Sequence, residues 1–274
     1  MAKYRIQDGI GIIPERAFCN NTNLTEIIIP NSVKEICNFA FSGCAGLKRI
    51  IIPNSVKYIG QSAFFRCESL KKIVIPNSVK YIEWGTFSDC TNLVDIILPE
   101  SISVIISYAF YGCSSLAEII IPNSVEGIGV CAFKNCKSLK KIVIPNSIKE
   151  IGDGAFSGCE NITEILIPKS VIEIEEYAFA ECKKLKEIAI LCPVRLKNVL
   201  FGCTSLKRMT LGVGIKGFSK DFFDGWSGNL EVINVPANKT EYYKKRIPER
   251  FHGIIKELPA EKKPPKIMQK VYES

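Results

Sequence analysis

The residues best suited to chemistry in this 274-residue sequence are its twelve cysteines. Thiols in such number could form disulfides, bind zinc, or fill a core as small apolar side chains. Disulfide frameworks are typical of small secreted chains, and zinc needs clustered thiolates or histidines. Asn21 stands where the repeated cysteine would fall in the first unit, and asparagine can bond loop backbone but would abolish metal binding. We therefore predict a buried structural ladder, with no metal and no cofactor, made of Cys44, Cys67, Cys90, Cys113, Cys136, Cys159, Cys182 and Cys203.

The remaining candidates for catalysis are few. Cys19, Cys37, Cys131 and Cys192 fall outside the ladder, and we expect them to be partly exposed, which suits a reducing compartment. A Cys/His or Ser/His/Asp arrangement would have to use His252, the only histidine. The glycine-rich stretch GVGIKG falls at a strand-to-turn position and is interpreted as a turn. We therefore predict that the protein is not an enzyme.

A 23-residue internal repeat must position these side chains. Its shared unit reads L-x-x-I-x-I-P-x-S-V-x-x-I-x-x-x-A-F-x-x-C-x-x. In the unit that begins at Leu70, Ile73 and Ile75 alternate with polar or outward residues before Pro76, which indicates a short strand that ends at proline. One unit cannot bury its own apolar side, so neighbouring units must stack. Phenylalanine recurs every 23 residues, at Phe18, Phe41, Phe64, Phe87, Phe110, Phe133, Phe156 and Phe179.

The repeats divide the chain into three parts. Residues 1–236 hold ten repeats and a terminal strand, with one repeat shortened by two residues around LCPVRLKN. Residues 237–258 read as a capping segment, a short helix interrupted near Pro248 that covers the last coil. Its side chains expected to face that coil are Tyr243, Ile247, Phe251 and Ile254.

Residues 259–274 form a lysine- and proline-rich tail, which we interpret as a solvated end. The alternative, that the tail docks on the rest of the chain, rests on its four large apolar or aromatic residues Ile267, Met268, Val271 and Tyr272.

The repeated unit resembles the BspA-like (Treponema-type, 23-residue) class of leucine-rich repeats over residues 1–236. The resemblance implies a leucine-rich repeat solenoid, a right-handed superhelix of the α/β type that is mostly β. It also implies one continuous parallel sheet, with short strands or 3-10 turns on the opposite face. Proteins of this class act in protein–protein interaction, so the resemblance implies a non-catalytic binding scaffold.

Two columns of the repeat point outward from the expected sheet and are the candidate partner-binding residues. The fifth position is apolar through seven repeats: Ile28, Ile51, Val74, Ile97, Ile120, Val143 and Leu166. The third position carries charges of both signs: Glu26, Arg49, Lys72, Asp95, Glu118, Lys141 and Glu164. The apolar column could bind a protein, or β-branched residues there could merely stabilise the sheet by packing on one another. Both interpretations remain open from the sequence.

Charge and hydropathy limit the other function classes. The net charge is +8, from 36 basic and 28 acidic residues, but acidic side chains interrupt any basic track, so we expect no nucleic-acid binding. No apolar run reaches the ~18 residues of a membrane span, and we expect no membrane insertion.

The N-terminus lacks the pattern of a signal peptide, which predicts a cytoplasmic protein. If a leader had been removed, a surface adhesin would be the alternative; a third is a self-associating rod or homodimer through the sheet face.

Overall fold

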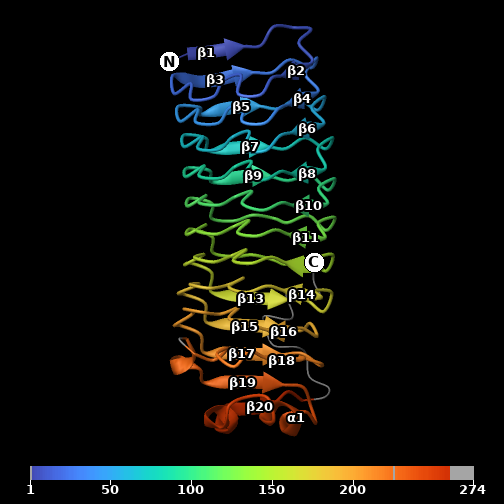
Figure 1. Ribbon diagram of the computed structural model, residues 1–274, viewed down its shortest axis with the longest axis vertical. Coiled ribbons are helices and arrows are strands. Elements are labelled where there is room, and N and C mark those ends of the chain that lie inside the picture. Colours follow the sequence, from blue (N-terminus) through green and yellow to red (C-terminus); the bar gives the residue numbers. More distant parts are fainter. Residues whose placement is uncertain (1, 225, 260–274) are drawn as a thin grey trace.

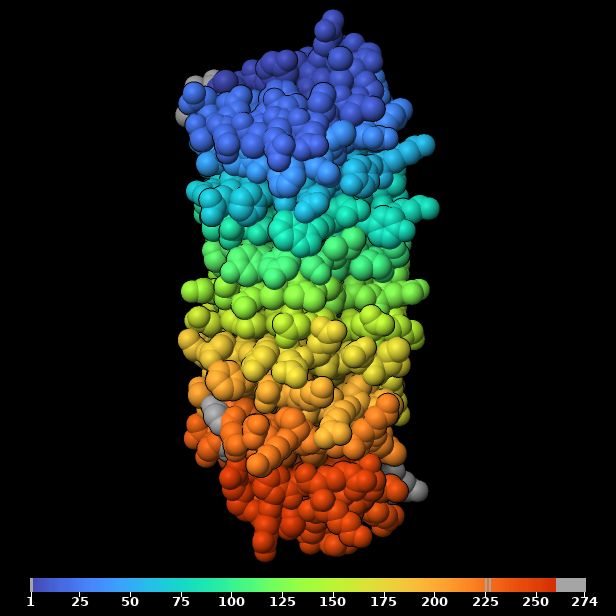
Figure 2. Space-filling model, viewed as in Figure 1, coloured from blue at the N-terminus to red at the C-terminus, as the bar shows by residue number. Residues whose placement is uncertain are grey.

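A computed structural model describes residues 2–224 and 226–259. The chain winds into stacked coils of parallel strands, running from the N-terminal coil to a C-terminal cap (Figure 1). The predicted leucine-rich repeat solenoid is therefore confirmed. In the space-filling view the coils form a nearly straight column (Figure 2). The prediction of a solvated tail falls almost wholly on residues 260–274, outside the described part of the chain.

One face of the solenoid, here called the sheet face, is formed by one strand or strand-like segment from each coil. Its strands are β1 (Ala2–Arg5), β3 (Leu24–Ile28), β5 (Arg49–Ile51), β7 (Lys72–Val74), β9 (Asp95–Ile97), β13 (Glu164–Ile167), β15 (Glu187–Ile190), β17 (Arg208–Leu211) and β19 (Val232–Val235). Residues at the same repeat position pair directly, as in Ile27 with Ile50. Because the strands pair residues of the same repeat position, the side chains at each repeat position form a line along the stack of coils.

The opposite face carries two-residue strands, as expected. They are β2 (Ile12–Ile13), β4 (Glu35–Ile36), β6 (Tyr58–Ile59), β8 (Tyr81–Ile82), β10 (Val104–Ile105), β11 (Gly127–Ile128), β12 (Glu150–Ile151), β14 (Glu173–Ile174), β16 (Arg195–Leu196) and β18 (Gly217–Phe218). They form three parallel groups, β2–β4–β6, β8–β10–β11–β12–β14 and β16–β18.

The sheet face is not one continuous ladder, which corrects the expectation of a single sheet. Its hydrogen-bonded groups are β1–β3–β5, β7–β9 and the group from β13 onward, with a lone bridge between Glu118 and Lys141. Proline in the repeat shortens the ladder because it has no N–H to donate. Where Leu191 and Gly212 replace that proline, their N–H groups donate to the carbonyls of Ile167 and Ile190, at 3.0 and 2.7 Å. The strands there reach four residues.

The core is a set of columns that run the length of the stack. The eight repeated phenylalanines stack from Phe18 to Phe179, with neighbouring ring centroids 5.1–5.6 Å apart and ring planes within 10° of parallel. From Phe41 onward these rings are fully buried. The column forms because every coil places its ring at the same angle, one strand spacing above the last.

The C-terminal cap differs in part from the expected helix. It consists of α1 (Thr240–Lys244), the 3-10 helix η2 (Glu249–Ile254) and a strand, β20 (Ile255–Glu257), that pairs parallel to β19. Another 3-10 helix, η1 (Ser227–Asn229), precedes β19. Tyr243, Ile247 and Phe251 are buried, while Ile254 is only partly buried. In the described part of the chain, no helix is long and apolar enough to cross a membrane.

Candidate functional site

The repeated cysteines lie in the core beside the phenylalanine stack. Each thiol donates to the carbonyl oxygen of the phenylalanine in the preceding coil, as Cys67 does to Phe41 at 3.2 Å and Cys203 to Phe179 at 3.0 Å. All eight side chains are fully buried. Burial raises the pKa of the Cys44 thiol to about 11 and that of Cys90 to about 12. At these cysteines burial therefore disfavours the thiolate, which is the form that acts as nucleophile and metal ligand.

The four cysteines outside the ladder are less uniform than expected. Cys19 and Cys37 are partly exposed, but Cys131 and Cys192 are buried, which corrects the prediction for these two. Cys192 lies two residues after the end of strand β15 and belongs, like Val194, to the main hydrophobic core. All twelve cysteines are free thiols.

His252 has no nucleophile beside it among the described residues. Its Nε2 lies 3.0 Å from the carbonyl oxygens of both Lys244 and Ile247, within the cap. Across residues 2–224 and 226–259, no group of three histidine, cysteine or acidic side chains could hold a metal ion. The imidazole therefore ties the end of α1 to η2.

Six of the seven predicted apolar residues form a line on the sheet face, here called the apolar stripe. They are Ile28, Ile51, Val74, Ile97, Ile120 and Val143, each at least 46% exposed. At the ~4.8 Å spacing of parallel strands, six coils span about 24 Å. Packing between neighbours in the column hides only about half of most of these side chains. A row of this length and exposure is a candidate docking surface.

The stripe is most open at Ile120, whose side chain is 79% exposed. Here the regular strands give way to the single bridge between Glu118 and Lys141. A shallow groove opens between these two coils and is lined by Ile120, Val143 and Asn123, among others. An apolar side chain from a partner could enter at this point between the two coils.

Leu166 does not belong to the stripe, and its prediction as an exposed residue is wrong. It lies at the same repeat position but is only 8% exposed. It packs with Ala189 and Leu191 in a small cluster separate from the main core. The apolar stripe therefore ends at Val143.

The charged third-position column runs beside the stripe. Some neighbouring strands bring opposite charges together in this column, and Lys72 Nζ lies 2.6 Å from the carboxylate of Asp95. Lys3 bonds Glu26 at 2.9 Å, and this hydrogen bond lowers the pKa of Glu26. Such exposed pairs contribute little stability, but they leave a polar rim of both signs along the stripe.

Aromatic side chains gather on the opposite face, a feature that the sequence reasoning missed. Tyr58 and Tyr81 are exposed at the same position of successive units, and Trp84 is exposed beside them in the chain. Trp84 lies 5.4 Å from Tyr108 between ring centroids, and Tyr108 lies 5.8 Å from Tyr111. The recurrence of tyrosine 23 residues after Tyr58 was the available signal. Because Trp and Tyr are enriched at interfaces, this aromatic patch is a second candidate surface.

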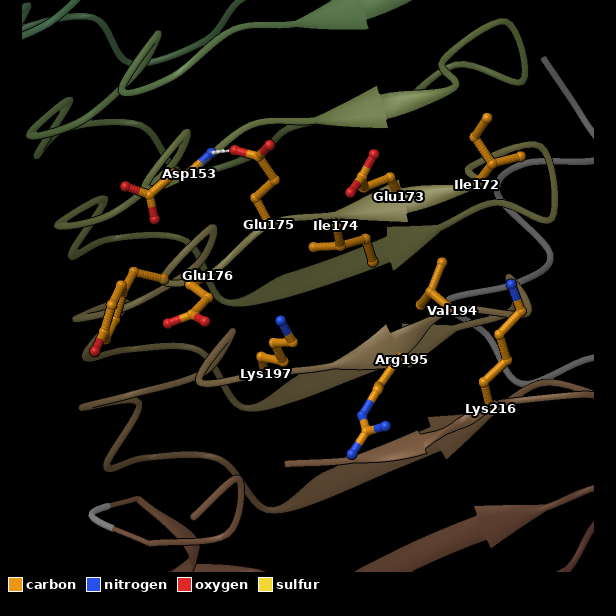
Figure 3. Close-up of a pocket in the computed structure, with 11 residues that line it drawn as sticks. Asp153, Ile172, Glu173, Ile174, Glu175, Glu176, Val194, Arg195, Lys197 and Lys216 are labelled. Atoms are coloured by element: carbon orange, nitrogen blue, oxygen red, sulfur yellow. Dashed lines mark hydrogen bonds between the residues drawn. The ribbon is translucent and has the colours of Figure 1, made fainter. Parts of the chain in front are cut away.

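A charged hollow also lies on the opposite face, where the strand group that ends in β14 is not hydrogen-bonded to β16. Figure 3 shows Glu173, Glu175 and Glu176 on one side and Arg195 and Lys197 on the other. A Glu175 oxygen accepts the Asp153 N–H at 2.8 Å. Burial, and then the charge of Glu175, raise the pKa of Asp153. The described lining of this hollow holds no histidine, cysteine or serine. The shortened repeat at LCPVRLKN was the sequence signal for it.

The stacked coils and their repeat define a leucine-rich repeat solenoid. The family model described as the BspA type leucine rich repeat region (6 copies) matches residues 11–140 and 127–246. The chain therefore belongs to the BspA-type leucine-rich repeat family, as the repeat predicted. No curated protein matches the chain.

Two solved structures show the same fold. A leucine-rich repeat protein from Bacteroides ovatus is 26% identical, with a TM-score of 0.52, and the alignment covers 94% of this chain and 84% of that one. The T. pallidum leucine rich repeat protein is 31% identical, with a TM-score of 0.50, over 66% of this chain and 77% of that one.

Proposed function

We propose that this protein is a non-catalytic interaction scaffold that binds a protein partner through the apolar stripe on its sheet face. The observation that carries the proposal is the unbroken line of half-exposed apolar side chains from Ile28 to Val143. Covering a half-exposed aliphatic side chain contributes on the order of 1 kcal/mol, so six in a row provide a substantial driving force.

The chemistry of the surface indicates what kind of partner would fit. The stripe is narrow and apolar, and the column beside it carries cations such as Lys72 and anions such as Asp95. A matching partner would present a ridge of apolar side chains with charges of both signs along one flank. This favours a protein over a nucleic acid, whose phosphates require a continuous basic track.

Cellular location remains a prediction. Twelve free thiols, two of them partly exposed, support a reducing compartment such as the cytoplasm.

The test is an affinity capture with three baits, followed by mass spectrometry. The first bait is the wild type, the second carries Ile97→Lys and Ile120→Lys, and the third carries the same change at Ile12 and Ile172, which are exposed on the opposite face. A partner of the stripe is retained by the first and third baits and lost from the second. A partner lost only from the third bait would refute the proposal and move the site to the opposite face.

Light scattering on the same three proteins separates hetero-binding from self-association. The proposal predicts a monomer for all three. A wild-type dimer that becomes a folded monomer only in the Ile97→Lys/Ile120→Lys variant would show that the stripe binds a second copy instead.

A further inference from the structure

A groove lies on the sheet face between β5 and β7, in the N-terminal half of the apolar stripe. These two strands belong to successive coils but to different hydrogen-bonded groups. The groove has a volume of about 500 Å³, which is within the range of ligand-binding sites. No acidic side chain is among the described residues that line it. Its lining includes two stripe residues and four cations, which are Ile51, Val74, Lys48, Arg49, Lys71 and Lys72.

Most of the positive charge at this groove is not neutralised by the described chain. Lys72 forms an ion pair with Asp95 at 2.6 Å. The exposed side chains of Lys48, Arg49 and Lys71 form no ion pair within residues 2–224 and 226–259. Glu26 lies in register with Arg49, but it is paired with Lys3 instead, at 2.9 Å. Three unpaired cations therefore surround an apolar groove, and their combined potential attracts an anion.

The interruption of the ladder also leaves a backbone donor at the groove. The Lys48 N–H donates to the Thr25 carbonyl at 2.9 Å, and the Val94 N–H donates to the Lys71 carbonyl at 3.0 Å. On either side of the break, this repeat position therefore bonds the preceding coil. The Lys71 N–H itself has no acceptor among the described residues. It is a donor that a carboxylate or a peptide carbonyl of a partner can satisfy.

The flank of the stripe changes sign directly after the groove. The next two coils carry Asp95 and Glu118 at the third position and no cation at the second. The other adjacent lysines beside the stripe are Lys140 and Lys141, and Lys141 lies in register with Glu118. The groove is thus the part of the stripe where unpaired positive charge is concentrated.

We propose that this groove binds an acidic segment of the protein partner, in which an apolar side chain is flanked by carboxylates. The apolar side chain packs between Ile51 and Val74, and the carboxylates lie against the unpaired cations. The inference rests on the proposed function and gives the bound partner a direction. The acidic segment of the partner lies on the N-terminal coils, and its basic residues follow beside Asp95 and Glu118.

The test uses a fluorescein-labelled synthetic peptide in which leucine alternates with glutamate, titrated with the protein and followed by fluorescence anisotropy. One comparison peptide has lysine in place of glutamate, and the other has serine in place of leucine. We expect the wild type to bind the acidic leucine peptide at least ~tenfold more tightly than either comparison peptide. Binding no tighter than that of a comparison peptide would overturn the proposal. Tighter binding of a single-stranded oligonucleotide in the same assay would overturn it too, and would assign the groove to phosphates.

Two variants with the same change of net charge locate the binding. Lys48→Glu/Lys71→Glu should weaken binding of the acidic leucine peptide at least ~tenfold. Lys57→Glu/Lys80→Glu, at exposed lysines on the opposite face of the same two coils, should leave it unchanged. Circular dichroism checks that both variants are folded. An equal loss in the two variants would show attraction to net charge alone and contradict a site in the groove.

The same variant separates this inference from the proposed function. A captured partner that is lost from the Ile97→Lys/Ile120→Lys bait should also be lost from a Lys48→Glu/Lys71→Glu bait. If the second bait retained that partner, binding through the stripe would stand and the acidic segment would be refuted. If the first bait also retained it, the proposed function itself would fail.

Discussion

The thiol of Cys67 donates a hydrogen bond to the carbonyl oxygen of Phe41, 3.2 Å away in the preceding coil. Seven more cysteines repeat this contact along the solenoid. The Phe41 carbonyl also accepts the backbone N–H of Cys44 at 3.1 Å, so the thiol supplies its second hydrogen bond. Cysteine thus suits this buried position because it is small and because its S–H group is a weak hydrogen-bond donor, and not because it is reactive.

Replacing one ladder cysteine should destabilise the fold measurably. Cys113→Ala removes the sulfur and leaves the Phe87 carbonyl without this donor, at an expected cost of about 1–2 kcal/mol in the free energy of unfolding. Urea denaturation followed by circular dichroism measures it. The control is Cys37→Ala at a partly exposed site, where we expect a cost below about 0.5 kcal/mol. Equal costs at the two sites would contradict a structural role for the ladder.

Stability should fall at alkaline pH because the ladder thiols resist ionisation only in the folded state. Folding raises the pKa of Cys44 from 9.0 to about 11 and that of Cys90 from 9.0 to about 12. These two protonated thiols therefore contribute their full share to the free energy of unfolding below pH 9, and this contribution is lost as the pH rises through 11 to 12. Urea midpoints at pH 8, 9.5 and 11 should decrease in that order. Cys90→Ala should weaken the decrease of the urea midpoint with pH. An equally steep decrease in this variant would contradict the role given to the buried Cys90 thiol.

Thiol labelling gives an independent measure of the same burial. With iodoacetamide at pH 8, Cys19 and Cys37 should be modified first, because they are the partly exposed cysteines. Ladder cysteines should react at least ~100-fold more slowly, through opening of the fold. Peptide mass spectrometry over time reports each site. Early modification of Cys136, which is fully buried, would show that the ladder is accessible.

The added ladder bond at Leu191 predicts a backbone-specific effect. Leu191→Pro restores the usual residue of the repeat but removes the N–H that donates to Ile167 at 3.0 Å. We expect a loss of about 1 kcal/mol relative to Leu191→Ala, which keeps that N–H and removes a comparable apolar contact. Thermal unfolding of the two variants compares them directly. If the proline variant were the more stable, the account of strand length would fail.

The repeat predicts the core because every coil reuses the same positions, so that Phe110 and Phe133 must stack once the register is known. It could not predict β20, because this strand forms only where the cap meets the exposed edge of β19. Nor could it predict the burial of Leu166, since its repeat position is exposed in the six preceding coils. The opposite-face hollow arises between coils of unequal length, and its lining residues belong to separate units.

The repeat pattern predicted the apolar stripe. Binding of a protein partner through this stripe is the central claim. The most direct measurement is calorimetric titration of a captured partner against three proteins: the wild type, Ile97→Lys/Ile120→Lys, and Ile12→Lys/Ile172→Lys. We predict at least ~100-fold weaker binding for the stripe variant, because two buried lysines oppose docking, and unchanged affinity for the opposite-face variant. Equal affinity for the wild type and the folded stripe variant would contradict the claim.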